Sequence, residues 1–196
     1  MIHTKDFNLQ SGDFKDYSRK LLPIIKVSTQ TGSTETKIMF SKDNQLLHQK
    51  IVGDISCFYG IETETSFQLL FEKNVPDLLN IEDVNKIAQE NLFRAIQNKL
   101  QVHKFGNSSI GLTCGGNHEA ALILLSGIWN LLSQKLGASI VFALIAKDLA
   151  VFSNSENVED INAIKEMISE VHSTGERLLS KKLFLHEDGK FEVFST

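Results

Sequence analysis

The residues with the clearest capacity for chemistry lie between positions 111 and 125, in the sequence GLTCGGNHEAALILL. Asn117, His118 and Glu119 directly precede the most apolar run of the chain, and Cys114 and two glycines come before them. Backbone amides at the beginning of a helix bind anions readily when glycines precede them. A cysteine with a histidine nearby can act as a thiolate with its base, or as one of a metal's ligands. This stretch is therefore the first candidate for a functional site.

A structural explanation accounts for the same residue types. Asn117 is predicted to cap a helix that begins at about His118, because its short side chain can accept hydrogen bonds from the first backbone amides. Gly115 and Gly116 suit a sharp turn from a strand into that helix. The negative charge of Glu119 suits the positive end of the helix dipole. We favour this structural role and keep the chemical interpretations as alternatives.

Each chemical alternative is weakened by a specific feature. The charge of Glu119 disfavours a bound anion, and the turn lacks the Lys and the Ser or Thr that follow the glycines of a P-loop. Cys114 and His118 would form a nucleophilic pair if the helix lowered the pKa of the thiol. As metal ligands they would need His103 or His172 as well, because zinc takes three or four ligands. We therefore predict no metal site and no cofactor.

Two further places carry acidic residues of interest. Asp148 stands at the junction of two apolar strands, where it would face a groove, although a tight turn at Lys147 and Asp148 explains it well. Glu62 and Glu64 have the spacing of paired acids on an extended segment, and the neighbouring threonines favour a solvated loop. The set of candidate ligand-binding residues is Cys114, Asn117, His118, Glu119 and Asp148.

The composition limits the class of protein. The chain of 196 residues is 42% hydrophobic, so it can bury a core without help from metals or disulfides. Its formal net charge of -4, without clustered Lys and Arg, argues against a nucleic-acid partner. No apolar stretch has the form of a signal peptide or the length to cross a bilayer, so we expect a cytoplasmic protein without a membrane partner. Cys57 and Cys114 form no disulfide framework, although a single bridge stays open.

The N-terminal section, residues 1–75, is predicted to be rich in strands after one short helix. That helix spans about residues 13–22 and ends before Pro23, because proline disfavours helical geometry in the residue before it. Short β-branched or apolar runs predict strands at about residues 23–29, 35–41, 51–61 and 65–73. Residues 76–80 are the best candidate boundary with the remainder of the chain.

Residues 76–196 show a rhythm of one helix followed by two strands, three times over. Apolar residues at helical spacing predict helices at about residues 81–100, 118–136 and 157–173, and strand pairs follow at about residues 100–113, 139–154 and 181–194. Asn80 with Asp83, and Asn157 in the third helix, are suited to cap the outer two helices. The step from Asp188 to Gly189 predicts a tight hairpin.

The helix predicted at 118–136 differs from the other two because it is apolar nearly all round. We therefore place it, buried, at the centre of the fold. The third helix has a charged outer face, and we expect Asp160 on that face to point to solvent. The predicted fold is α+β and one compact unit, in which a mostly antiparallel sheet is covered by three main helices and flanked by the N-terminal section.

Four stretches of the C-terminal section resemble the YtpQ-like bacterial proteins, a family of unknown function. They are EDVNKIAQENL, GGNHEAALILL with the following IW, IVFALIAKDLAVF and LLSKKLFLHEDGKFEVF, which together cover about residues 81–194. The resemblance lies in the pattern and order of these stretches and includes no catalytic signature. It implies a cytosolic α+β protein of bacterial type with no established activity, cofactor or site, so no functional residue is carried over.

Three functions are compatible with the sequence. The first, which we favour, is a non-enzymatic binding module for protein partners or for a second copy of the chain, since its many strands must end as sheet edges. The second is a small-molecule-binding protein or a hydrolase-type enzyme with its site at the turn Gly115–Glu119, where at least three candidate side chains should converge in a pocket. The third is a structural subunit of a larger assembly.

Overall fold

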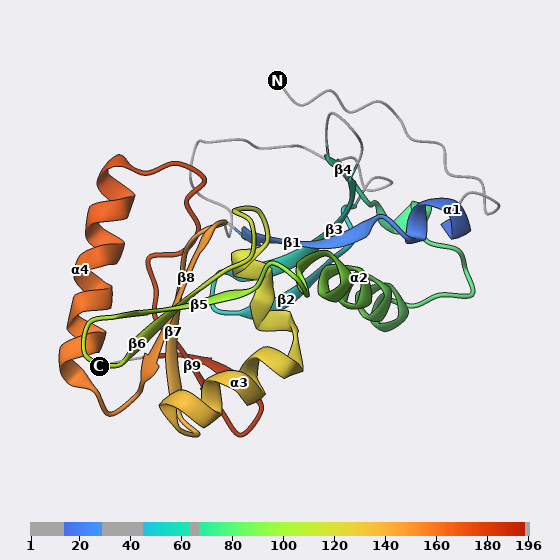
Figure 1. Ribbon diagram of the computed structural model, residues 1–196. Helices are drawn as coiled ribbons and strands as arrows, with labels where there is room; N and C mark the ends of the chain where they lie inside the picture. Colours follow the sequence, from blue (N-terminus) through green and yellow to red (C-terminus); the bar gives the residue numbers. More distant parts are fainter. Residues whose placement is uncertain (1–13, 29–44, 63–66, 195–196) are drawn as a thin grey trace.

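The computed structural model describes residues 14–28, 45–62 and 67–194 of the chain, which form two antiparallel sheets with helices around them (Figure 1). The strands of the smaller sheet are β1 (Leu21–Val27), β2 (His48–Val52), β3 (Ile55–Glu62) and β4 (Phe67–Leu69). Their order is β1-β3-β2, and β4 also pairs with β3.

The larger sheet has the order β10-β9-β7-β8-β6-β5, and every neighbouring pair in it is antiparallel. Its strands are β5 (Gln101–Phe105), β6 (Ser109–Thr113), β7 (Ile140–Ala146), β8 (Leu149–Asn154), β9 (Phe184–Glu187) and β10 (Lys190–Val193). The main helices are α2 (Ile81–Ile96), α3 (Ser126–Leu136) and α4 (Val158–Thr174). Three shorter helices are α1 (Phe14–Ser18), η1 (Glu72–Asn74) and η2 (Glu119–Leu124). The predicted α+β class, with antiparallel sheets and three main helices, is confirmed.

The larger sheet separates two hydrophobic cores. Strand β7 lies within this sheet and is buried along its whole length, so its side chains enter both cores. Val141 and Ile145 pack in the smaller core under α4, whereas Phe142 and Leu144 belong to the larger core. Residues of α2, α3 and the smaller sheet fill the rest of the larger core. Figure 1 accordingly shows α4 on one side of the sheet and α2 on the other.

The predicted central segment, 118–136, consists of two helices, and only the first is buried as expected. Helix η2 is enclosed, whereas α3 buries one face and exposes Ser126, Asn130 and Ser133 on the other, so the prediction of one helix buried nearly all round is wrong for α3. The 3-10 helix η2 ends at Leu124, Leu125 is extended with φ −96° and ψ 115°, and α3 begins at Ser126. The indole N–H of Trp129 donates to the carbonyl oxygen of Ile123 at 2.8 Å. The carbonyl group of Ile123, next to the break between η2 and α3, therefore keeps a hydrogen-bond partner although the helix is interrupted.

Pro23 lies inside β1, and the predicted helix before it is shorter than expected. Helix α1 ends at Ser18, and the chain is already extended at Leu21. Within the described residues β1 pairs only with β3, where Pro23 lies opposite Tyr59. An edge strand tolerates proline because one side of its backbone has no partner that needs the missing N–H.

The strands predicted at 51–61 and 65–73 are shorter than expected. The first is two strands, β2 and β3, joined at Gly53, whose φ of +54° favours glycine. The second is limited to β4 and is followed by η1. The strand predicted at 35–41 lies outside the described residues.

The caps predicted at Asn80 and Asn157 and the hairpin predicted at Asp188 are confirmed. Asn80 accepts hydrogen bonds from the amides of Glu82 and Asp83 at the beginning of α2. Asn157 accepts from the amide of Asp160 at the beginning of α4, and β9 and β10 form the expected hairpin. The rhythm of a helix followed by two strands is present three times. Helix α2 ends at Ile96, earlier than predicted.

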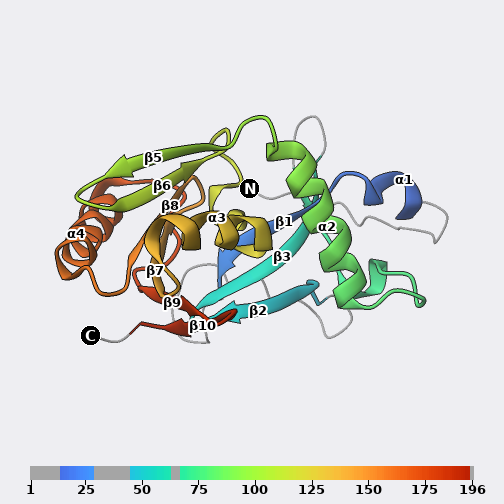
Figure 2. The ribbon, with the colours of Figure 1, turned by 60° about the horizontal axis from the view of Figure 1, so that its bottom comes forward.

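The two sheets share the larger core, and polar contacts hold α2 to the smaller sheet and the smaller sheet to the segment before β9. The side-chain amide of Asn91 in α2 donates to the carbonyl oxygens of Ser18 and Leu21 at 2.7 and 2.8 Å. The hydroxyl of Ser180 donates to the carboxylate of Asp54, whose two oxygens lie 2.9 and 3.1 Å away. Figure 2 shows β10 beside β2, so strands of the two sheets also lie next to each other. The domain boundary at 76–80 stays a prediction.

Candidate functional site

The predicted site lies in the turn that connects β6 to η2. Two consecutive glycines, Gly115 and Gly116, have φ values of +111° and +83°, which residues with a side chain rarely adopt. This conformation directs the amides of Cys114, Gly116 and His118 toward one carboxylate. The glycines therefore make the sharp turn that the sequence predicts, and they also make an anion-binding concavity.

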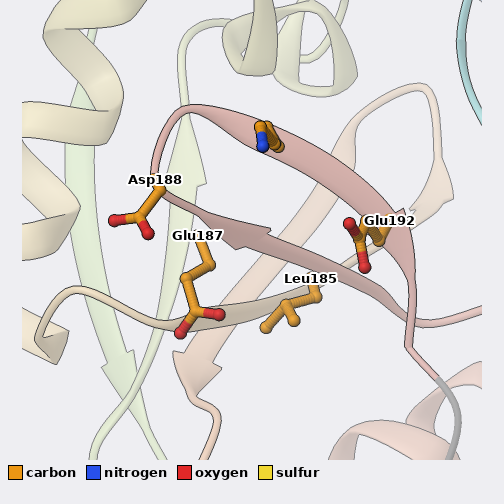
Figure 3. A pocket seen from close by; sticks show the side chains of 5 residues that line it. Leu185, Glu187, Asp188 and Glu192 are labelled. Atoms are coloured by element: carbon orange, nitrogen blue, oxygen red, sulfur yellow. The ribbon is translucent and has the colours of Figure 1, made fainter.

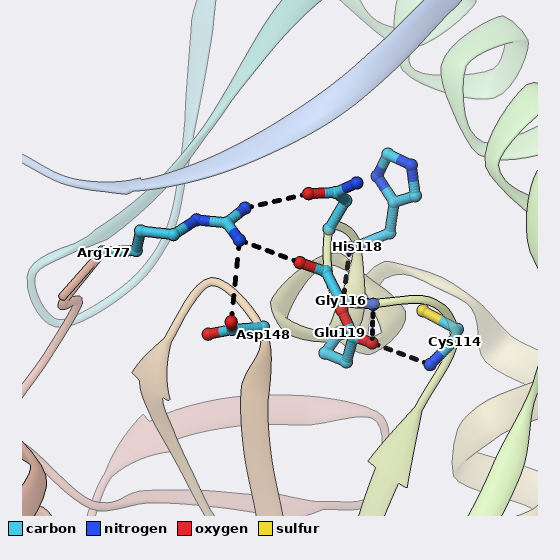
Figure 4. Close-up of polar contacts among 7 residues, drawn as sticks. Cys114, Gly116, His118, Glu119, Asp148 and Arg177 are labelled. Atoms are coloured by element: carbon cyan, nitrogen blue, oxygen red, sulfur yellow. Dashed lines mark hydrogen bonds and ion pairs between the residues drawn. The ribbon is translucent and has the colours of Figure 1, made fainter. Parts of the chain in front are cut away.

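The anion in this concavity is the side chain of Glu119. One of its oxygens accepts from the amides of Cys114 and Gly116 at 2.8 and 2.6 Å, and the other accepts from the amide of His118 at 2.9 Å (Figure 4). Glu119 is 1% exposed. Burial by itself raises its pKa, but the hydrogen bonds from these amides outweigh burial and hold the pKa below its usual value. The chain thus fills its own anion site.

Asn117 does not cap the helix that follows, contrary to the prediction. The N-cap residue of η2 is His118, and no side chain makes a capping hydrogen bond at this end of the helix. The side chain of Asn117 is exposed, and its oxygen accepts from Arg177 at 3.1 Å. The carboxylate of Glu119 satisfies the amides of the turn, so these amides do not require the side chain of Asn117.

Cys114 does not have the chemistry of a nucleophile. Burial and, to a smaller extent, the nearby charge of Glu119 together raise the pKa of its thiol to about 12. A nucleophilic role requires the opposite shift. Cys57 is also buried, and both thiols are free, so the single disulfide that the sequence left open is not formed.

Arg177 joins two of the remaining candidates at the surface. Its guanidinium donates to the carbonyl oxygen of Gly116 at 2.9 Å and to the side chain of Asn117, and it lies 3.6 Å from the carboxylate of Asp148 (Figure 4). Asp148 lies in the tight turn between β7 and β8, as predicted. Four of the five candidates therefore fall into two groups, an interior pair of Cys114 and Glu119 and a surface pair, Asn117 and Asp148, held by Arg177.

His118 does not join Glu119 in an acid–base pair. The two side chains point in different directions from the turn in Figure 4. The other histidines considered as ligands have separate contacts: His103 is exposed and lies 2.8 Å from the hydroxyl of Thr113, and His172 lies 3.3 Å from the carbonyl oxygen of Ser180. Within the described parts of the chain, no three His, Cys, Asp or Glu residues are grouped so that they could hold a metal ion.

Arg177 and Lys147 bond to the turn or to η2 and to each other, and the sequence did not single them out as candidates. The backbone N–H of Lys147 donates to the carbonyl oxygen of Arg177, and its own carbonyl oxygen accepts from the amide of Ala120, both at 3.1 Å. Arg177 and Gly116 are 61 positions apart, and no local spacing relates such residues.

Asp160 forms a second buried carboxylate site, although its side chain was expected to face solvent. It is 2% exposed and accepts from the backbone amides of Asn107 and Ser108 at 3.0 and 2.8 Å, and also from the hydroxyl of Ser108 at 2.7 Å. Burial by itself raises its pKa, and the hydrogen bonds lower it below the usual value. These contacts fasten the hairpin of β5 and β6 to the beginning of α4.

A hollow on the surface lies at the opposite edge of the larger sheet (Figure 3). Its lining consists of Leu185, Glu187, Asp188, Lys190 and Glu192. These residues belong to the hairpin of β9 and β10 and include none of the candidate residues. Three of the five are acidic, so the hollow does not suit an anion. It also contains neither the cysteine nor the histidine of the nucleophilic pair considered for the turn.

The comparisons with known proteins identify no relative. No family model matches the chain, and no curated protein or solved structure matches it either. The resemblance to the YtpQ-like proteins therefore stays a prediction. None of the described helices combines the length and the apolar character that crossing a membrane requires.

Proposed function

We propose that the chain is a non-enzymatic binding module that holds an extended, acidic segment of a partner protein along strand β5. The observation that carries this proposal is the position of β5 at the open end of the larger sheet, with four of its five residues exposed. Within the described residues β5 pairs with β6 alone, so the outer side of its backbone is available to another strand. An extended segment can add to such an edge through main-chain hydrogen bonds.

The charge around β5 supports an acidic partner. No Asp or Glu stands between Glu90 and Glu119 in the sequence, although the whole chain has a net charge of -4. The exposed residues Lys99 and Lys104 lie in this interval. Val102 on the same strand is 39% exposed and offers an apolar contact. Lysines on an edge strand also discourage pairing between like edges, which favours an acidic partner over a second copy of the chain.

The two other functions receive less support. A small-molecule site or a hydrolase centred on the turn Gly115–Glu119 requires free catalytic groups, but Glu119 and Cys114 are buried and bonded within the chain. A structural subunit would be unstable when purified alone, and the large shared core argues for a chain that folds by itself.

A peptide of alternating Glu and Val, with a Lys and Val peptide of equal length as its counterpart, tests the proposal. We expect the acidic peptide to slow hydrogen exchange at the amides of β5, because those groups gain strand partners. Lys104→Glu should weaken binding about fivefold, since it replaces attraction by repulsion at an exposed site.

The matched control is Lys190→Glu, an exposed lysine on β10 at the other end of the same sheet, which should leave the affinity unchanged. Equal binding of the acidic and basic peptides, or protection that maps away from β5, would contradict the proposal. Dimerisation protected at β5 would assign the edge to a second copy of the chain instead.

A further inference from the structure

The imidazole of His186 in β9 stacks on the indole of Trp129 in α3, and this contact joins the hairpin of β9 and β10 to the helix. The two ring centroids lie 4.0 Å apart, and the ring planes make an angle of 18°. Phe191, opposite His186 in the hairpin, has its ring centroid 5.3 Å from the imidazole. The hydrogen bond from Trp129 to the carbonyl oxygen of Ile123 fixes the indole, so its face is presented to His186.

The Nδ1 atom of His186 is buried and has no hydrogen-bond partner among the described residues. A neutral imidazole can leave this nitrogen as a bare acceptor, whereas a charged imidazole carries N–H donors on both of its nitrogens. A buried donor without an acceptor costs free energy. The aromatic surroundings of His186 therefore suit the neutral imidazole.

The charged side chains of the surrounding elements do not offset this cost. Strands β7 and β8 have no titratable residue, and those of the other elements are Glu187, Asp188, Lys190 and Glu192 of the hairpin, Lys135 of α3, and His48 and Lys50 of β2. Because side chains alternate along a strand, Glu187, Lys190 and Glu192 point to the face of the hairpin opposite to His186, where they line the hollow. The residues of α3 and β2 are exposed.

The direction of the pKa shift agrees with this geometry. The face of an indole attracts a cation, so the stack by itself would raise the pKa of His186. Burial instead lowers the pKa below its ordinary value of 6.5, so the loss of hydration outweighs that attraction. Neutral His186 thus stabilises the fold fully above pH 6.5. This contribution is lost as the pH falls below 6.5 and through the lowered pKa.

We propose that the stack of His186 on Trp129 is a pH-sensitive contact, which holds the hairpin of β9 and β10 against α3 when the imidazole is neutral and loosens this end of the larger sheet when the imidazole is charged. Uptake of one proton by the imidazole is the chemical step. The hairpin lies at the end of the sheet opposite to β5, so the proposal does not depend on the partner segment proposed for that strand.

Two measurements on the unmodified chain test the proposal directly. NMR titration should give His186 a pKa below 6.5, and the emission of Trp129, the one tryptophan of the chain, should change with the same midpoint. Hydrogen exchange at the amides of β9 and β10, corrected for the intrinsic effect of pH, should be about threefold faster at about pH 5.5 than at about pH 7.5. A pKa of 6.5 or above, or exchange that does not accelerate, would overturn the proposal.

His186→Phe keeps an aromatic ring in the stack and removes its titration, so exchange in the hairpin should no longer accelerate at the lower pH. His48→Phe is the matched control. His48 also stacks on an aromatic ring, that of Phe58, with the centroids 5.2 Å apart, but it is exposed. This variant should keep the acceleration of the unmodified chain. Acceleration that persists in His186→Phe, or that disappears in His48→Phe, would show that His186 is not the group responsible.

Discussion

Glu119 occupies the place where a glycine-rich turn would otherwise bind an external anion. Its two carboxylate oxygens accept three backbone amides, so the anion is part of the chain and folds with it. A buried carboxylate is costly to the fold unless such bonds compensate it. Burial, together with the nearby charge of Glu119, explains why Cys114, at one end of the turn, is an inert thiol and not a nucleophile.

Glu119→Gln should lower the free energy of unfolding at pH 7 by about 2 to 4 kcal/mol, because an amide has one acceptor oxygen and its NH₂ group faces a backbone N–H. Urea denaturation measures this change. Glu90→Gln is the control, since Glu90 is exposed and forms only an exposed ion pair with Arg94; its effect should stay below about 0.5 kcal/mol. Equal stability of the two variants would contradict the structural role of Glu119.

The pH dependence of stability gives a second measurement of the same residue. The pKa of Glu119 is lowered in the folded chain from its usual value of 4.5, so its carboxylate stabilises the fold fully above that pH. That contribution is lost as the pH falls below 4.5 and through the lowered pKa. The Gln variant lacks this titration, so the difference in stability between it and the unmodified chain should shrink over the same interval.

At the level of secondary structure, the hairpin of β5 and β6 depends on a contact with α4. Its turn passes so close to Asp160 that a Cβ added to Gly106 would lie 2.7 Å from a carboxylate oxygen. Gly106 also has φ of +60°. The turn therefore needs glycine for two independent reasons, its backbone conformation and its neighbour. Movement of this contact would also disturb the edge strand β5.

Gly106→Ala should lower the free energy of unfolding by about 2 to 4 kcal/mol, because conformational strain adds to the displacement of Asp160. Gly189→Ala separates the two effects. Gly189 has φ of +73°, but a Cβ there would meet no atom within 4 Å, so only the strain of about 1 kcal/mol applies. Denaturant unfolding of both variants tests the prediction, and equal losses would show that the contact with Asp160 contributes nothing.

For the whole molecule, the larger core connects the two sheets. Leu21 of β1 and Phe142 of β7 belong to the same cluster, and both are fully buried. The hydrogen bonds from Asn91 and from Ser180 cross between parts that are far apart in the sequence. A shared core of this kind favours unfolding of both sheets in one step.

Leu21→Ala should lower the stability of both sheets by the same amount, about 2 to 5 kcal/mol, because it leaves a cavity in the shared core. Hydrogen exchange at the amides of β3 and β7 reports on each sheet separately. The fluorescence of Trp129, the one tryptophan of the chain, gives an independent unfolding curve. A change confined to β3 would show that the two sheets unfold as separate units.

The features that the sequence determined by itself are those set by neighbours along the chain. The cap at Asn80, the cap at Asn157 and the hairpin at Asp188 are decided within a few residues, as are the amphipathic faces of α2 and α4. Burial of η2 follows from its apolar composition, whereas α3 exposes one face. These properties depend on short-range geometry and on apolar spacing, which the sequence contains directly.

Tertiary structure decided the features that depend on distant partners. Pro23 could end a helix or lie in an edge strand, and only the pairing of β1 with β3 decides between these. The sequence by itself allows Asp160 to face solvent, and only the contact with the Gly106 turn shows that its carboxylate is buried. Arg177 contacts Asn117 and Asp148 across separations at which spacing carries no information. Such contacts arise when folding brings remote segments together, so only the three-dimensional structure shows which side chains they join.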